Sequence, residues 1–365
     1  MVTTEVVDAD LLDSLDRFFR ETVDHELITA AEGTELLEDL WARCDGMDLL
    51  GIGIDPDRGG AGGGLPQLVA LMQAAGRHAV PLPLLEHHLA TWLLVSAGAT
   101  VPDGLSTVAP GTAADEAHLS GTDLHGCFHQ VAWTGAARRV VAIVPDETGV
   151  LCTVAAGRES LTVEPGTDLA GQPRDVVRAQ GMPCQVLARG VDRTEMQRRA
   201  VLLRAAQMTG AMEAVAGRTL AYVRERQQFG AAIGSFQSVQ QHVVTVQQVA
   251  TMTALCVGRA VSALGTGGGS FEVAALRVIA SDNAATAVRS AHQAHGAIGM
   301  TREFGLQTLT RRLNTWRWDF GAPSDAAREI GALVTDAEKL SAVITAEPGS
   351  QNIAYPRGEL TKGNR

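Results

Sequence analysis

The sequence predicts a mainly α-helical protein with a small β domain in the middle of the chain. Apolar residues recur at three- and four-residue spacing near the N-terminus, short β-favouring runs fill the centre, and helical patterning returns from residue 194 onward. Only 4% of the residues are aromatic whereas 39 are glycine, which favours closely packed helices with small side chains over an aromatic-rich β sandwich. A chain of 365 residues is long enough for two or three domains.

Residues 1–103 are predicted to form a helical N-terminal domain. Between residues 11 and 19 the leucines and phenylalanines fall on one helical face. The glycine-rich segment 51–64 then interrupts the pattern before another helix near Leu65. Such a loop can cradle a phosphate through its backbone N–H groups. No Gly-Lys-Ser/Thr follows it, however, so a turn between helices is the favoured interpretation.

Residues 104–192 are predicted to form the β domain, because Gly, Pro and Asp turn signals separate short runs of β-favouring residues. The expected strands lie at 119–122, 140–144, 149–154 and 184–187. Residues 193–346 are predicted to form a C-terminal helical bundle, which breaks at the loop 265–270 and the turn 296–299. The polar segment 347–365 contains Pro and Gly and is predicted to be a disordered tail.

Charge and composition exclude several functions. A net charge of −11 argues against nucleic-acid binding, which needs a concentrated positive surface. The N-terminus lacks the pattern of a signal peptide, and the longest apolar runs are too short to span a bilayer. The five cysteines are scattered and form no C-x-x-C pair, so the sequence predicts neither disulfides nor a metal site and is typical of a cytoplasmic protein.

Two motifs in the C-terminal part carry the most specific information. The first is Arg224–Gly230 (Arg-Glu-Arg-Gln-Gln-Phe-Gly), followed by Phe236-Gln237. The second is Gln293–Glu303 (Gln-Ala-His-Gly-Ala-Ile-Gly-Met-Thr-Arg-Glu). Together they resemble the acyl-CoA dehydrogenase family. The resemblance implies an N-terminal helical domain, a middle β barrel and a C-terminal four-helix bundle over nearly the whole chain.

The resemblance also implies an FAD site shared between subunits. Residues of both motifs would reach the adenosine-diphosphate half of the FAD, with the Arg226 guanidinium offering a planar fork of donors to the pyrophosphate. These residues are Arg226, Gln228, Phe229, Gln237, Gln293, Gly296 and Ala297. In the β domain, Trp133 and Thr134 are partial counterparts of the family's flavin-ring contacts. Trp133 is equally well explained as a core residue.

The catalytic base is the point at which the sequence departs from the family. The family's most frequent glutamate lies 27 residues after the glutamine that matches Gln293, and Phe320 stands there. The neighbouring Asp319 is a weaker substitute. Other family members place the glutamate 11 residues before this glutamine, where Asp282 lies on an apolar helical stripe. Asp282 is therefore expected to be buried, and it is the preferred candidate for the base.

The expected activity is the FAD-dependent α,β-dehydrogenation of an acyl-CoA thioester, with an electron-transferring flavoprotein or a similar acceptor. The chain resembles subunits of actinobacterial-type heteromeric enzymes, which accept bulky substrates such as steroid side-chain thioesters. This implies a homo-oligomer or a heterotetramer with a sister subunit. Two alternatives stay open: a non-catalytic subunit that completes the FAD site of a sister chain, and a flavin oxidase or monooxygenase of the same fold.

Overall fold

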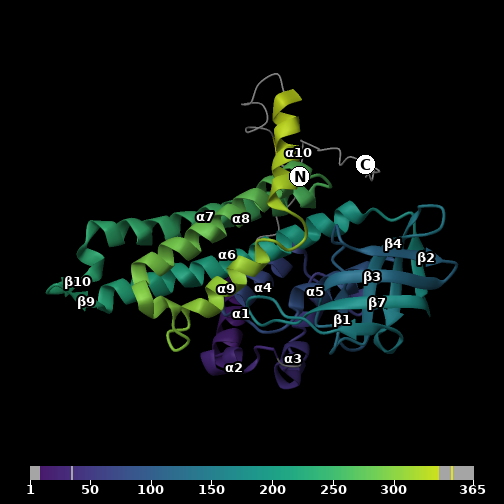
Figure 1. Ribbon diagram of the computed structural model, residues 1–365, viewed down its shortest axis with the longest axis horizontal. Coiled ribbons are helices and arrows are strands. Elements are labelled where there is room, and N and C mark those ends of the chain that lie inside the picture. The colour runs from purple at the N-terminus through teal and green to yellow at the C-terminus, as the bar shows by residue number, and fades with distance from the viewer. Residues whose placement is uncertain (1–8, 34–35, 337–346, 348–365) are drawn as a thin grey trace, which may run out of the picture.

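Helices, then strands, then helices again follow one another along the chain, in the predicted order (Figure 1). The computed structural model describes residues 9–33, 36–336 and 347. The predicted tail lies outside the described residues apart from Glu347. None of the described helices is long and apolar enough to cross a membrane. All five cysteines are free thiols, as predicted.

The N-terminal part consists of short helices and the glycine-rich loop. Asp24 caps α2, because its carboxylate accepts a hydrogen bond of 2.8 Å from the backbone N–H of Leu27. The later helix α5 is buried on nearly every side. The elements are α1 (Ala9–Thr22), α2 (His25–Ala30), α3 (Glu38–Asp45), η1 (Leu49–Gly51), η2 (Pro56–Arg58), α4 (Leu65–Arg77) and α5 (Leu84–Ser96).

The central part forms two four-stranded sheets. Their strand orders are β1-β4-β5-β8 and β2-β3-β7-β6, and β1 runs parallel to β4. The strands are β1 (Ser106–Val108), β2 (Glu116–Ser120), β3 (Asp123–Ala132), β4 (Arg139–Pro145), β5 (Leu151–Gly157), β6 (Thr162–Glu164), β7 (Arg174–Pro183) and β8 (Gln185–Arg189), with the turn η3 (Arg158–Ser160). Residues from both sheets, such as Leu119, Phe128, Val140 and Val154, share one core. The strands of the expected β domain are thus divided between two sheets, and neither sheet closes on itself in the described chain.

The two longest strands, β3 and β7, were not among the expected ones. β3 has polar residues and Gly126 in its interior, and its pairing with β7 shifts register twice. A β-carbon on Gly126, whose φ is +122°, would lie 1.9 Å from the carbonyl oxygen of Glu116 on β2. Glycine is therefore required where these strands approach closely. The irregular pattern conceals both strands in the sequence.

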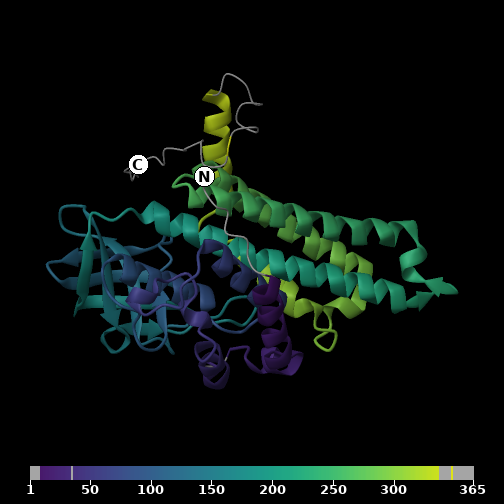
Figure 2. The ribbon, with the colours of Figure 1, turned by 180° about the vertical axis from the view of Figure 1, so that it is seen from behind.

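The C-terminal part is built around the 33-residue helix α6, with α7, α8 and α9 packed beside it (Figures 1 and 2). Gly76 of α4 and Gly210 of α6 allow these two helices to touch. A β-carbon on either glycine would lie 1.9 Å from a backbone oxygen of the other helix. The elements are α6 (Arg193–Glu225), β9 (Gln227–Gln228), β10 (Ala231–Ala232), η4 (Ile233–Ser235), α7 (Gln237–Gly265), α8 (Ser270–His295), η5 (Gly296–Met300), α9 (Leu306–Trp316) and α10 (Pro323–Asp336).

Candidate functional site

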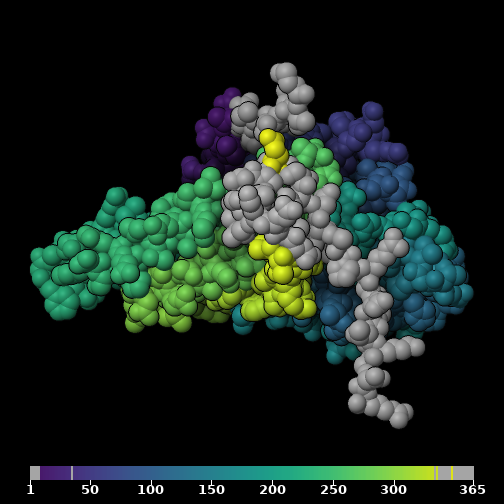
Figure 3. Space-filling model, turned by 90° about the horizontal axis from the view of Figure 1, so that it is seen from above, coloured from purple at the N-terminus to yellow at the C-terminus, as the bar shows by residue number. Residues whose placement is uncertain are grey.

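The two sequence motifs meet at one end of the C-terminal helices. Val223 on α6, Ile233 after the β9–β10 hairpin and Ala294 on α8 share a small buried cluster. The rings of Tyr222 and His295 stack beside it, with centroids 4.6 Å apart. The sequence thus folds both motifs into one surface. This end of the bundle projects well beyond the rest of the molecule (Figure 3).

The cofactor candidates on this surface are exposed. Arg226 directly follows α6 as its C-cap residue, and its side chain has no hydrogen-bond or ion-pair partner among the described residues. Phe229 stands at the tip of the hairpin with φ of +54° and 93% of its surface exposed. The exposed candidates are Arg226, Gln228, Phe229, Gln237, Gln293, Gly296 and Ala297.

The exposed groups of this surface are chemically suited to the diphosphate half of the FAD that the resemblance implies. It offers a guanidinium and several side-chain amides whose donors are not used within the chain. The backbone at Gly296 is also open, because no other atom lies within 4 Å of where its β-carbon would stand. Phe229 and Phe236, whose ring centroids lie 6.1 Å apart, together expose apolar surface beside these polar groups.

Trp133 and Thr134, the candidates for the flavin ring, do not fit that role in this chain. Trp133 is only 4% exposed and packs in a cluster with Leu105. The hydroxyl of Thr134 is fully buried and points back to the carbonyl of Val131 at 3.4 Å. The backbone N–H of Thr134 donates to Asp175 at 3.1 Å. Both residues are thus held inside the β domain.

The position expected for the base lies beside a buried group of charges, here called the ion network: Glu86, Arg174, Arg204 and Asp319. Arg204 donates to Glu86 at 2.6 Å and lies 3.0 Å from the Asp319 carboxylate. Arg174 donates to the same two acids, at 3.2 Å to Glu86 and 3.1 Å to Asp319. The Arg204 guanidinium also faces the rings of Phe320 and Trp316. Asp319 is therefore held by two arginines.

The ion network joins all three parts of the chain. Glu86 comes from α5, Arg174 from β7, Arg204 from α6, and Asp319 from the segment after α9. Burial alone would raise the pKa of Glu86, but the guanidinium groups of Arg204 and Arg174 outweigh it and hold that pKa below its ordinary value. Burial likewise disfavours the charged form of Arg174, yet Asp319, Glu86 and Asp168 raise its pKa. Glu86 and Arg174 therefore stay charged at neutral pH.

Asp282 lies on the outer face of α8 and is exposed in this chain, so the expectation that it is buried is wrong. Its stripe of neighbours, including Val278 and Ile279, is only half-buried. The fully buried face of the helix contains Leu276 and Ala280 instead. The spacing of apolar residues predicted that this stripe is the buried one. Because α8 is rich in alanine, it carries small apolar residues on more than one face, and the spacing does not show which face is buried. The carboxylate of Asp282 has no ion-pair partner among the described side chains.

Sequence reasoning missed the other members of the ion network. A signal exists in retrospect for Glu86 and Arg204, because each of these charges interrupts a run of apolar residues. Glu86 follows two leucines in the buried helix α5, and Arg204 stands between Leu203 and Ala205 in α6. Charged residues are rarely fully buried unless they are paired. The pattern indicates burial with a partner but does not identify the partner.

Comparisons with known proteins place this fold and surface in one family. The model of the acyl-CoA dehydrogenase N-terminal domain matches residues 8–100, and the model of the C-terminal domain matches residues 194–331. The chain belongs to the acyl-CoA dehydrogenase family. It is thus an oxidoreductase of the class that acts on the CH–CH group of an acyl-CoA, and FAD is the cofactor of that family.

Individual relatives agree with this assignment. The chain is 28% identical over 317 residues to acyl-CoA dehydrogenase IpdE2 of Mycolicibacterium smegmatis, and the match covers 85% of this chain and 93% of IpdE2. The solved ChsE4–ChsE5 complex from Mycobacterium tuberculosis has a TM-score of 0.83 at 19% identity, covering 90% of this chain and 97% of the matched one. PigA with FAD and proline has a TM-score of 0.81 at 18% identity, with the same coverage.

Proposed function

We propose that this chain is a subunit of an oligomeric, FAD-dependent acyl-CoA dehydrogenase. In this proposal it completes the FAD site with the exposed end of its C-terminal helices, while a sister chain supplies the catalytic base. The assembled enzyme introduces a double bond between the α and β carbons of an acyl-CoA and passes the electrons to an electron-transferring flavoprotein or a similar acceptor. The observation that carries this proposal is the ion network beside Phe320.

The ion network makes it unfavourable for the reacting carbons of the substrate to bind beside Phe320 in this chain. A base must reach the α proton of the thioester, and Phe320 has no group that accepts a proton. Asp319 carries a carboxylate, but Arg174 and Arg204 both hold it within 3.1 Å. An apolar acyl chain entering here would separate buried, paired charges, which costs several kcal/mol. The side chains that fill this space therefore favour a sister chain as the source of the base.

The exposed end of the C-terminal helices keeps its capacity for FAD. The exposed Arg226 guanidinium pairs with a diphosphate, and the amides of Gln237 and Gln293 add neutral hydrogen bonds. When bound, FAD accepts the hydride that leaves the β carbon of the substrate. The residues of this chain orient the cofactor from its adenosine-diphosphate half. The same exposed end accounts for a cofactor shared between two chains.

An apolar groove on α7 supports assembly with a sister chain. The groove is lined by side chains of α7 alone: Val244, Gln247, Gln248, Thr251, Met252 and Leu255. Leu255 is 70% exposed and Val244 is 52% exposed, so the groove presents apolar surface along one face of the bundle. Contiguous apolar surface of this kind marks interaction sites. The chemistry of the partner surface would be apolar as well.

Co-expression with candidate sister acyl-CoA dehydrogenase chains tests the proposal. The chain alone is expected to be colourless, whereas the complex should elute as one oligomer and show flavin absorbance. Acyl-CoA should bleach the flavin in the complex only. The proposal fails if the isolated chain purifies with stoichiometric FAD and an acyl-CoA reduces it. A complex that forms but contains no flavin would refute the role in FAD binding.

A second candidate function, catalysis by this chain itself, is favoured by Asp282. Its carboxylate is accessible and lacks a charged partner among the described residues. If it is the base, Asp282→Asn in the flavin-loaded complex slows flavin reduction by at least about 100-fold. Asp282→Glu should then retain activity, and the flavin spectrum should stay the same in both variants. Wild-type rates in Asp282→Asn place the base on the sister chain.

A further inference from the structure

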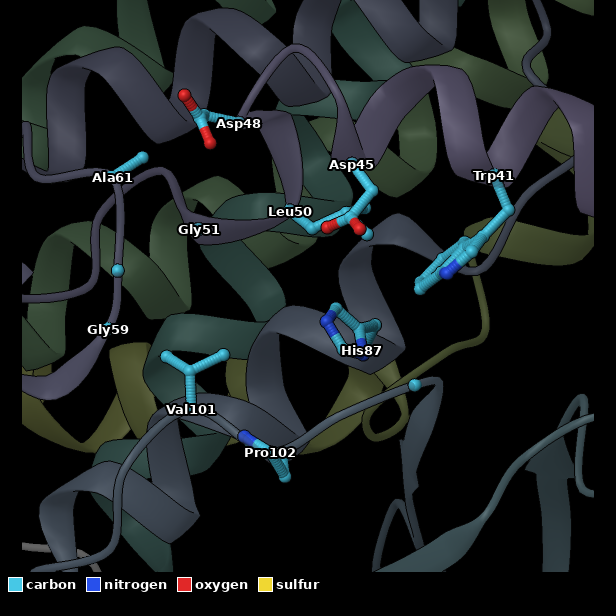
Figure 4. A pocket seen from close by; sticks show the side chains of 12 residues that line it. Trp41, Asp45, Asp48, Leu50, Gly51, Gly59, Ala61, His87, Val101 and Pro102 are labelled. Atoms are coloured by element: carbon cyan, nitrogen blue, oxygen red, sulfur yellow. The ribbon is translucent and has the colours of Figure 1, made fainter.

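A polar pocket in the N-terminal part has no role in the proposed dehydrogenation. It lies between the end of α3, the glycine-rich loop and the first turn of α5 (Figure 4). Its volume is about 170 Å³. It is called the His87 pocket here, and it is lined by Trp41, Asp45, Asp48, Leu50, Gly51, Gly59, Gly60, Ala61, His87, Val101, Pro102 and Gly104.

His87 places an unused hydrogen-bond donor in this pocket. The side chain is only 3% exposed, and its Nδ1 accepts the backbone N–H of Ser106 at 3.2 Å. Burial lowers the pKa of His87 to about 4, so the ring is neutral at pH 7. With Nδ1 as the acceptor, Nε2 carries the proton. Nε2 has no hydrogen-bond partner among the described residues, and the ring faces the pocket in Figure 4.

Two acidic side chains, both exposed, give the pocket its negative charge. Asp45 and Asp48 line it, and neither forms an ion pair with any described residue. No arginine or lysine is part of the lining, although Arg139 lies near enough to contribute to the lowered pKa of His87. The Trp41 ring stands edge-on to His87, with centroids 5.0 Å apart, and adds an aromatic wall. Carboxylates together with an indole ring are the groups that bind an organic cation.

The same geometry argues against an anion or a metal ion. The loop amides that could hold a phosphate are used inside the loop, as in Ala61 N–H to Gly51 (2.9 Å) and Gly53 N–H to Gly62 (2.8 Å). Two carboxylates would also repel an anion. A protonated Nε2 cannot ligate a metal, and the described residues contain no cluster of three metal-binding side chains.

We propose that the His87 pocket binds a small protonated amine with a hydroxyl or carbonyl oxygen next to it. The ammonium group pairs with the carboxylates of Asp45 and Asp48, and the oxygen accepts the hydrogen bond of His87 Nε2. The pocket is smaller than the roughly 300–1,000 Å³ of drug-sized sites, so the ligand is an amino alcohol or a molecule of similar size. This site is separate from the FAD surface, whereas its His87 directly follows Glu86 of the ion network in α5.

Ethanolamine is the test ligand, and ethylene glycol is its uncharged control. Each is titrated into full-length protein that carries 13Cε1-labelled histidine, and the His87 resonance is assigned from a His87→Gln variant. So small a ligand is expected to bind with a Kd on the order of 1 mM. The His87 resonance should shift saturably with ethanolamine and much less with ethylene glycol.

Variants of the lining residues distinguish a specific ligand site from a polar pocket that holds only water. Asp45→Asn should weaken ethanolamine binding at least about tenfold, because a charge-assisted hydrogen bond is lost. Asp57→Asn, a nearby exposed acid on η2 outside the lining, should bind like the wild type. Three outcomes would overturn the proposal: no saturable shift, equal shifts from ethanolamine and ethylene glycol, or unchanged affinity in Asp45→Asn.

Discussion

Replacing Arg204 by methionine should destabilise the protein far more than replacing an exposed arginine. The Arg204 side chain is 3% exposed, and it bonds Glu86 and Gln207. Methionine keeps much of the apolar volume between Trp316 and Phe320, so a cavity contributes little. The buried Glu86 carboxylate would keep only Arg174, at 3.2 Å. Breaking a buried ion pair in this way costs about 3–5 kcal/mol.

Calorimetry converts this cost into a melting temperature. At about 2.1 cal/mol/K per residue, a chain of 365 residues should lose about 4–7 °C. The matched control is Arg178→Met. Arg178 lies 3.3 Å from Glu164, but both side chains are about half exposed or more. Its loss should cost no more than about 1 kcal/mol, or about 1 °C.

A double variant and a pH series make the reasoning refutable. Glu86→Leu with Arg204→Met leaves Arg174 paired with Asp319 and should recover most of the stability lost in either single variant. Because the pKa of Glu86 is lowered in the folded protein, its ionic contribution is fully present above the unfolded carboxyl pKa of about 4.3. That contribution disappears as the pH falls through the folded pKa. Additive losses in the double variant, or an Arg204→Met that melts like Arg178→Met, would refute the ion network.

Three further predictions concern other parts of the chain. Arg226→Ala should weaken FAD binding in the complex by about 1.5–3 kcal/mol without changing the melting temperature. Arg224→Ala, at an exposed residue of the same turn, should leave FAD binding unchanged, and equilibrium dialysis with FAD measures the affinity of both variants. Leu255→Glu should prevent assembly in sedimentation velocity, while Met47→Glu, at a half-exposed apolar side chain between α3 and η1, should assemble normally. Gly210→Ala would place a β-carbon 1.9 Å from the Gln73 oxygen and should lower the free energy of unfolding by more than about 3 kcal/mol. Gly217→Ala, with open space around it, should raise the free energy of unfolding by up to about 1 kcal/mol, and chemical denaturation measures both changes.

The sequence predicted most of the fold because its signals are local. Helical periodicity and turn residues lie within a few positions of one another, and the order of helices and strands follows from them. The residues of the proposed FAD surface could be named from the sequence for the same reason, since Arg226 and Gln237 lie within one short segment. β3 and β7 escaped because register shifts and an interior glycine break their alternation. The division of the strands into two sheets depends on which strands pair with each other, and no local sequence pattern specifies that pairing.

The ion network could not be predicted, because its members are remote in the chain. Glu86 lies 118 residues from Arg204 and 88 from Arg174, and Arg174 lies 145 from Asp319. Local sequence gives no information on which charges will meet after folding. The burial of Asp282 was mispredicted for a related reason. A helix rich in alanine can turn several faces inward, and the neighbours of α8 decide which face is buried.

The members of the ion network also depend on one another energetically, and this bears on the division of labour between subunits. A lone Glu86 or Arg204 in the apolar surroundings of α5 and α6 would cost several kcal/mol. Each buried charge is stable only when its partners are present. A protein that acquired one of these charges alone, in an otherwise apolar substrate cavity, would therefore be unstable. A subunit that does not catalyse the reaction need not admit an acyl chain. The four paired charges of the ion network can therefore occupy the region beside Phe320. In the proposed assembly this subunit still keeps Arg226 and the hairpin exposed, because they would complete a cofactor site with the sister chain.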